Sequence, residues 1–129
     1  MQANEGAIEL TIPADSKLLR LVRLVASGLA STAGFDIDEL DDLRIAVDEA
    51  VTALLEGGDG SRIALQFTVE DRMVVMSSAT PTGSGDPLDA NRLEISTQIL
   101  GAVCDEHDLD VVDGELRVRI CRRAAARAA

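Results

Sequence analysis

Two hydrophobic spacings alternate along this chain, and their order constrains the fold more than any other feature. The longest stripe at helical spacing consists of six aliphatic residues: Ile37, Leu40, Leu43, Val47, Val51 and Leu54. Apolar residues that recur every three or four positions lie on one face of an α-helix. Residues 62–70 then alternate apolar and polar side chains, as half-buried strands do, and residues 73–77 return as a second strand. A long amphipathic helix is therefore predicted to lead into an antiparallel hairpin.

The rest of the chain repeats these two patterns. We expect a short strand, two further helices and a second hairpin, over residues 7–12, 16–33, 92–104 and 109–121. The proline- and glycine-rich residues 79–88 are expected to form a loop. Antiparallel strands with helices gathered together predict an α+β fold. Its form is a two-layer sandwich, in which an antiparallel or mixed sheet of about five strands is covered on one face by three helices.

The length of the chain suits one domain. A chain of 129 residues buries enough surface to be stable without a disulfide or a structural metal. We place the domain at residues 1–122 and expect residues 123–129 to form a short Arg/Ala tail.

The charge balance limits the class of partner. Twenty-three acidic residues stand against twelve basic ones, which gives a net charge of −11. The aromatic residues are Phe35 and Phe67, with no Tyr or Trp. Binding to a phosphate backbone needs Lys and Arg, and binding to single strands needs exposed rings. We therefore expect no nucleic-acid partner and favour a protein partner with a basic surface.

Neither a membrane nor an oxidising compartment is indicated. No apolar run reaches the roughly 18 residues of a membrane span, and residues 1–6 are polar, without the pattern of a secretory signal. Cys104 and Cys121 lack the spacing of metal ligands, so we expect reduced, packed thiols. These features predict a cytoplasmic protein with no membrane partner.

The most informative stretch is D-D-L-R-I-A-V-D-E-A-V-T-A-L-L, at residues 41–55. Its A-V-D-E-A-V-T-A portion, residues 46–53, resembles the second helix of the bacterial anti-sigma factor kinases. That family is a branch of the ATPase fold shared by histidine kinases, gyrase and Hsp90. The first strand, the first helix, the F-D-I-D-E-L lead-in and the following hairpin also fall in the family's order. The resemblance therefore covers nearly the whole chain and implies a histidine-kinase-like ATPase fold.

The resemblance also implies where a nucleotide site would lie. Glu49 matches the family's glutamate that orients or deprotonates the attacking nucleophile, and is the candidate general base. Ala53 stands where the family has the asparagine that holds Mg²⁺ between the phosphates of ATP. A methyl group cannot ligate magnesium, which prefers oxygen, so no metal site is expected here.

Two loop features of the implied site are altered as well. A serine, Ser77 or Ser78, stands where the family has an aspartate that reads adenine, and Ser78 is the candidate. Gly83 and Gly85 are candidate remnants of the loop that follows. The family's glycine-rich lid corresponds to residues 91–100, which contain no glycine to close on a triphosphate.

Losing a magnesium ligand and the lid removes most of the electrostatic stabilisation on which phosphoryl transfer depends. The resemblance therefore implies no cofactor and no efficient kinase activity. One alternative stays open: a carboxylate of Asp48, Asp86 or Asp89 replaces the lost ligand, and ATP with Mg²⁺ still binds. A second alternative also stays open, in which Glu49 is only a solvated helix carboxylate.

The family's partner binding does not need a nucleotide site. The resemblance implies a homodimer that sequesters an alternative sigma factor in a stress-response pathway, and an anti-anti-sigma factor that releases it. Arg20 matches the arginine near the start of the first helix that both partners contact; Arg23 and Lys17 are weaker candidates. The family dimerises through the first strand and first helix. The apolar residues of that strand are Ile8, Leu10 and Ile12.

Two other functions stay open at this point. The first is an active ATP-dependent serine/threonine-protein kinase that phosphorylates the anti-anti-sigma factor. The second is a scaffolding or sensor module without a sigma partner. Stabilisation by Mg²⁺-ATP would favour the first, and a pull-down without RNA-polymerase-associated proteins would favour the second.

Overall fold

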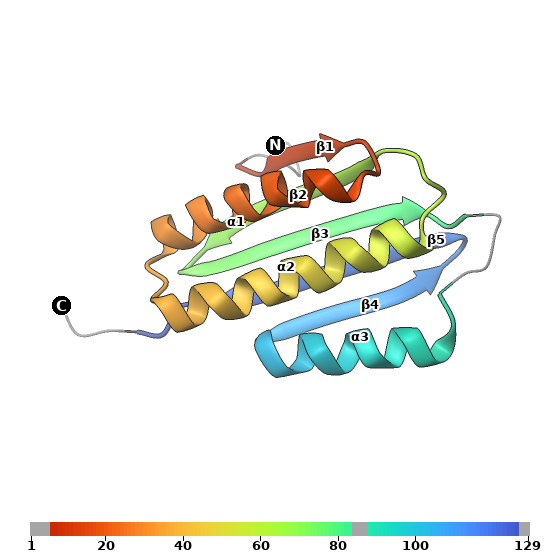
Figure 1. Cartoon of the computed structure of the whole chain (residues 1–129). Coiled ribbons are helices and arrows are strands. Elements are labelled where there is room, and N and C mark those ends of the chain that lie inside the picture. Colours follow the sequence, from red (N-terminus) through yellow and green to blue (C-terminus); the bar gives the residue numbers. More distant parts are fainter. Residues whose placement is uncertain (1–5, 84–87, 127–129) are drawn as a thin grey trace.

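A five-stranded sheet carries three helices on one of its faces in the computed structural model, which describes residues 6–83 and 88–126 (Figure 1). The strands are β1 (Ile8–Ile12), β2 (Ile63–Glu70), β3 (Met73–Pro81), β4 (Glu106–Val112) and β5 (Glu115–Arg123). The helices are α1 (Leu19–Ala33), α2 (Ile37–Gly57) and α3 (Ala90–Val103), and a short 3-10 turn, η1 (Ser16–Leu18), precedes α1. The α+β two-layer prediction is confirmed.

The sheet order is β1-β2-β3-β5-β4, and every neighbouring pair is antiparallel. Figure 1 shows α2 in the middle of the helical layer, with α1 on one side and α3 on the other. In the part of the chain that the structure describes, no helix is long and apolar enough to cross a membrane.

Local chemistry fixes the helix ends. The Asp36 carboxylate accepts the Glu39 N–H at 2.8 Å, and the Glu39 carboxylate accepts the Asp36 N–H at 2.9 Å, which completes a capping box at the start of α2. Helix α1 ends at Gly34, whose φ of +84° is favourable for glycine. The Asp15 carboxylate caps the start of the first helical segment, whose first turn is 3-10 rather than α-helical.

The core forms between the helices and the covered face of the sheet. Small residues on α1 and α2, including Ala26, Ala30, Ala46 and Ala50, are fully buried and let the helices approach the strands closely. The largest fully buried side chains come from both layers, among them Phe67 of β2 and Leu43 of α2.

Three strands are longer than the sequence predicts, and one of them, β5, continues two residues past the expected end to Arg123. Strand β3 continues through the expected loop to Pro81, because β5 pairs with it as far as Pro81 opposite Glu115. Strand β4 begins at Glu106 rather than Leu109, because that segment pairs with the far end of β5. Ser77 and Ser78 consequently lie inside a strand and not at its end.

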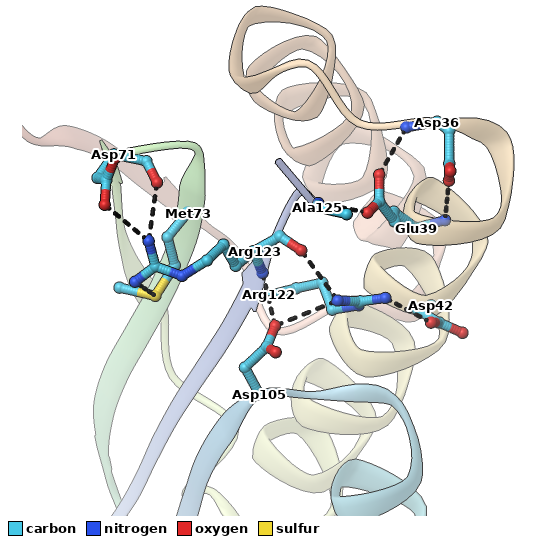
Figure 2. Close-up of polar contacts among 9 residues, drawn as sticks. All are labelled: Asp36, Glu39, Asp42, Asp71, Met73, Asp105, Arg122, Arg123 and Ala125. Atoms are coloured by element: carbon cyan, nitrogen blue, oxygen red, sulfur yellow. Dashed lines mark hydrogen bonds and ion pairs between the residues drawn. The ribbon is translucent and has the colours of Figure 1, made fainter. Parts of the chain in front are cut away.

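The segment after β5 is tied to the start of α2 by a polar network (Figure 2). Arg122 donates to Asp42 at 3.1 Å and to Asp105 at 3.2 Å. The Ala125 N–H donates to the Glu39 carboxylate at 2.6 Å, and the intervening Ala124 is buried. Of the tail expected at residues 123–129, Arg123 therefore ends β5, and residues 127–129 lie outside the described part.

Candidate functional site

A cluster of four polar side chains joins the middle of α2 to the start of α3. The Glu49 Oε1 atom accepts hydrogen bonds from Arg92 Nη1 at 2.7 Å and from Ser96 Oγ at 2.6 Å. Arg92 Nε donates to Glu56 Oε2 at 3.0 Å, and Arg92 also contacts the Ser96 hydroxyl. We call Glu49, Glu56, Arg92 and Ser96 the α2–α3 clamp.

Helical spacing places these side chains together. Glu49 and Glu56 are seven residues apart, which is two turns of α2, and Arg92 and Ser96 are four apart on α3. The Asp89 carboxylate accepts the Arg92 N–H at 2.7 Å and caps α3 at its start. Arg92 therefore lies in the first turn of α3, within reach of both glutamates.

The clamp holds Glu49 in its charged form. The Glu49 side chain is 15% exposed, and Ser96 is fully buried. Burial raises the pKa of Glu49, but the hydrogen bonds from Ser96 and Arg92 outweigh this effect and hold the pKa below its ordinary value. The hydrogen bond to Glu49, with the second one to Glu56, raises the pKa of Arg92. The pair is therefore fully ionised at neutral pH.

The other candidate nucleotide residues either offer no ligand atom or are hydrogen-bonded to the protein's own backbone. Ala53 is completely buried and offers no oxygen to a metal. The Ser78 hydroxyl donates to the Ala64 carbonyl on the neighbouring strand at 2.7 Å. The Gly83 N–H donates to the Gly57 carbonyl at 3.3 Å, so it lies against the end of α2. Gly85 lies outside the described residues.

The candidate replacement carboxylates have other contacts. Asp48 receives two hydrogen bonds from Arg23, at 2.6 and 3.0 Å. Asp89 caps α3, and Asp86 lies outside the described residues. Within residues 6–83 and 88–126, no group of three or more His, Cys, Asp or Glu side chains is arranged to hold a metal ion.

The sequence analysis did not identify Arg92, Ser96 or Glu56 as site residues. The expectation for residues 91–100 concerned their lack of glycine and not their side chains. The signal available was the pair Arg92 and Ser96, spaced four apart like Glu49 and Ala53 on α2. Spacing places residues on one face of a helix, but it does not say which neighbouring helix that face meets.

The outer face of α1 carries the candidate partner residues. Arg20 is exposed and, in the described part of the chain, makes no ion pair. Lys17 is exposed one turn before it, in η1. Leu21 and Leu24 lie on the same side, 41% and 67% exposed. Arg23 differs, because its guanidinium is bound by Asp48, and this hydrogen bond raises the pKa of Arg23.

Comparison with known proteins gives close relatives. The chain is 38% identical over 88 residues to the serine-protein kinase RsbW of Halalkalibacterium halodurans, a match that covers 66% of the chain and 53% of that relative. It is 34% identical over 116 residues to the serine-protein kinase RsbW of Bacillus subtilis, covering 85% of the chain and 68% of that relative. The first match thus spans about half the length of its relative. No family model matches the chain.

A solved structure has the same fold. The crystal structure of the RsbU and RsbW domains of a Mycobacterium tuberculosis protein superposes with a TM-score of 0.72 at 20% identity, over 95% of this chain and 33% of that one. The identity and coverage of the Bacillus subtilis relative, together with this fold, show that the chain belongs to the RsbW family of serine-protein kinases.

Proposed function

We propose that this protein is an anti-sigma regulatory protein, which sequesters an alternative sigma factor and is released by an anti-anti-sigma antagonist without efficient kinase activity. Membership of the RsbW family supports the regulatory role. One observation carries the rest of the proposal. The α1 face with Arg20 is open to a partner, whereas the α2 face with Glu49 is bound by α3.

The α1 face has the chemistry of a protein interface. The exposed Arg20 guanidinium beside Leu21 and Leu24 combines a planar hydrogen-bond donor with apolar contact area. Arg20 pairs with a carboxylate of the partner in this proposal, and Lys17 adds charge at the rim. The net charge of −11 on the chain as a whole complements a basic partner surface.

Release follows from competition for this face. Sigma factor and antagonist bind overlapping surfaces, so each lowers the apparent affinity for the other by mass action. No phosphoryl transfer is needed for that exchange. The homodimer forms along β1, which is an edge strand of the sheet and needs a covering partner. Ile8 is 44% exposed there, whereas Ile12 is buried in its own core.

The relatives are named as kinases, and kinase activity uses ATP. The residues of this chain do not fit that use of the α2 face. Magnesium needs oxygen ligands and Ala53 supplies none. Glu49, the candidate general base, already accepts hydrogen bonds from two side chains of α3. If the chain is an active kinase instead, Mg²⁺-ATP at a hundred times its Kd will stabilise it by about 2.7 kcal/mol.

The test is capture of the sigma factor by Arg20→Ala and by a matched control. Co-purification from the host with mass spectrometry identifies the sigma factor, and titration calorimetry then compares the variants. We expect Arg20→Ala to weaken binding about tenfold or more. Arg62→Ala removes another exposed arginine, just before β2, and should bind like the wild type. Equal affinity of Arg20→Ala and wild type would remove Arg20 from the interface.

A further inference from the structure

Helix α3 is packed closely against α2 along the face that carries Glu49 and Ala53. Ser96 and Leu100 are fully buried on the inner side of α3. At the end of α2, a Cβ added to Gly57 would lie 2.8 Å from the Leu116 side chain and 3.0 Å from that of Leu88, which precedes the Asp89 cap of α3. The α2 face is thus covered both beside Glu49 and at its C-terminal end. Figure 1 shows α3 running alongside β4 and α2.

The clamp holds two carboxylates of α2 through one guanidinium and one hydroxyl of α3. An anionic ligand that entered this face would have to break those bonds. Glu49 and Glu56 lie two turns apart on α2, and the Arg92 guanidinium bridges them at 2.7 and 3.0 Å. The buried Ser96 hydroxyl completes the coordination of Glu49. A triphosphate entering here would separate Arg92 from both carboxylates and bring its own negative charge next to them, which is most unfavourable beside Glu49, the less exposed of the two.

We propose that α3 itself occupies the α2 face at the place where the family binds a nucleotide, and that Arg92 and Ser96 hold it there. We call α3 in this role the plug. The Arg92 guanidinium then neutralises Glu49, so this carboxylate is not free to act as a general base. The helical layer, including the α1 face, consequently has one arrangement whether or not nucleotide is present. This inference deepens the proposed function and rests on it. Its consequence for regulation is that capture of the partner does not depend on ATP.

The experiment measures hydrogen exchange of residues 90–103 by mass spectrometry on the full chain, with and without millimolar Mg²⁺-ATP. The first variant, Arg92→Ala, removes the bridge. The second, Arg92→Ala with Glu49→Gln, also removes the carboxylate that would be left partly buried without its cation, so that the fold is kept. The control, Arg117→Ala, breaks a 3.0 Å ion pair to Glu115 on the exposed sheet.

In the wild type we expect slow exchange in α3 that Mg²⁺-ATP does not change. Both clamp variants should exchange about tenfold or more faster in α3, because the hydrogen bonds to charged groups that close this region are lost. Exchange in α1 should stay as in the wild type, and Arg117→Ala should match the wild type throughout.

Two results would overturn the plug. One is protection of α2 or α3 by Mg²⁺-ATP in the wild type, which would show that nucleotide reaches this face. The other is unchanged slow exchange of α3 in both clamp variants, which would show that the clamp does not hold the helix. Sigma capture is measured separately on the wild type. Failure of capture refutes the proposed function and leaves the exchange result standing.

Discussion

The capping box at the start of α2 gives a quantitative test of how the C-terminal segment is held. Glu39 is 6% exposed, and its carboxylate accepts the Asp36 N–H at 2.9 Å and the Ala125 N–H at 2.6 Å (Figure 2). Glu39→Ala removes both acceptors. We assign about 1.5 kcal/mol to the bond from Ala125 and about 1 kcal/mol to the bond from Asp36, whose N–H is reached by water once the carboxylate is gone. The expected loss is about 2.5 kcal/mol.

Urea denaturation followed by circular dichroism measures this loss. The midpoint should fall with an unchanged slope, because the surface exposed on unfolding stays the same. The control is Asp38→Ala, in the same helical turn, which removes an exposed carboxylate and its interaction with the helix dipole. That change should cost about 0.5 kcal/mol. If Glu39→Ala costs no more than Asp38→Ala, the segment after β5 is not anchored through Glu39.

Two further predictions follow from single residues. Burial raises the pKa of Glu49, but the hydrogen bonds from Ser96 and Arg92 outweigh it and hold the pKa below its ordinary value of 4.5. The stability that Glu49 contributes is therefore complete above pH 4.5 and is lost as the pH falls through the lowered pKa. Glu49→Gln should therefore lose less stability than the wild type between neutral and acid pH in thermal melts; parallel curves would contradict the charged clamp. On α1, Gly34→Ala should destabilise by about 1 kcal/mol because its φ is +84°, whereas Gly28→Ala, at an open helical position with ordinary φ, should stabilise by about 0.5–1 kcal/mol. Urea midpoints that move in the same direction for both glycine variants would refute this reasoning.

The order and type of the elements could be predicted because they depend on local spacing. The stripe that begins at Ile37 predicts α2, and the structure gives α2 over Ile37–Gly57. The length of β3 could not be predicted in the same way. Thr80 and Pro81 belong to the segment that was expected to be a loop. They extend the strand instead, because β5 pairs with them. Strand ends depend on a neighbour that is distant in sequence.

In the candidate site, too, residues within one helix could be identified from the sequence, whereas contacts between helices could not. Glu49 and Ala53 were identified within one helix through the resemblance of residues 46–53 to the anti-sigma factor kinases, which implies that Ala53 stands in place of a metal-binding asparagine. Arg92 is 43 residues away from Glu49, and no pattern within α3 indicates that it bridges two carboxylates of α2.

The sequence by itself determined the order of the helices and strands, the resemblance to the anti-sigma factor kinases, and the alanine at position 53, where that resemblance implies an oxygen ligand. These properties follow from side-chain spacing and side-chain identity within single segments. Only the tertiary structure decided that α3 closes over α2 and that Arg23 is bound by Asp48 while Arg20 stays exposed. Such contacts join residues tens of positions apart. Their distances are set by the packing of the whole helical layer on the sheet, which no local pattern encodes.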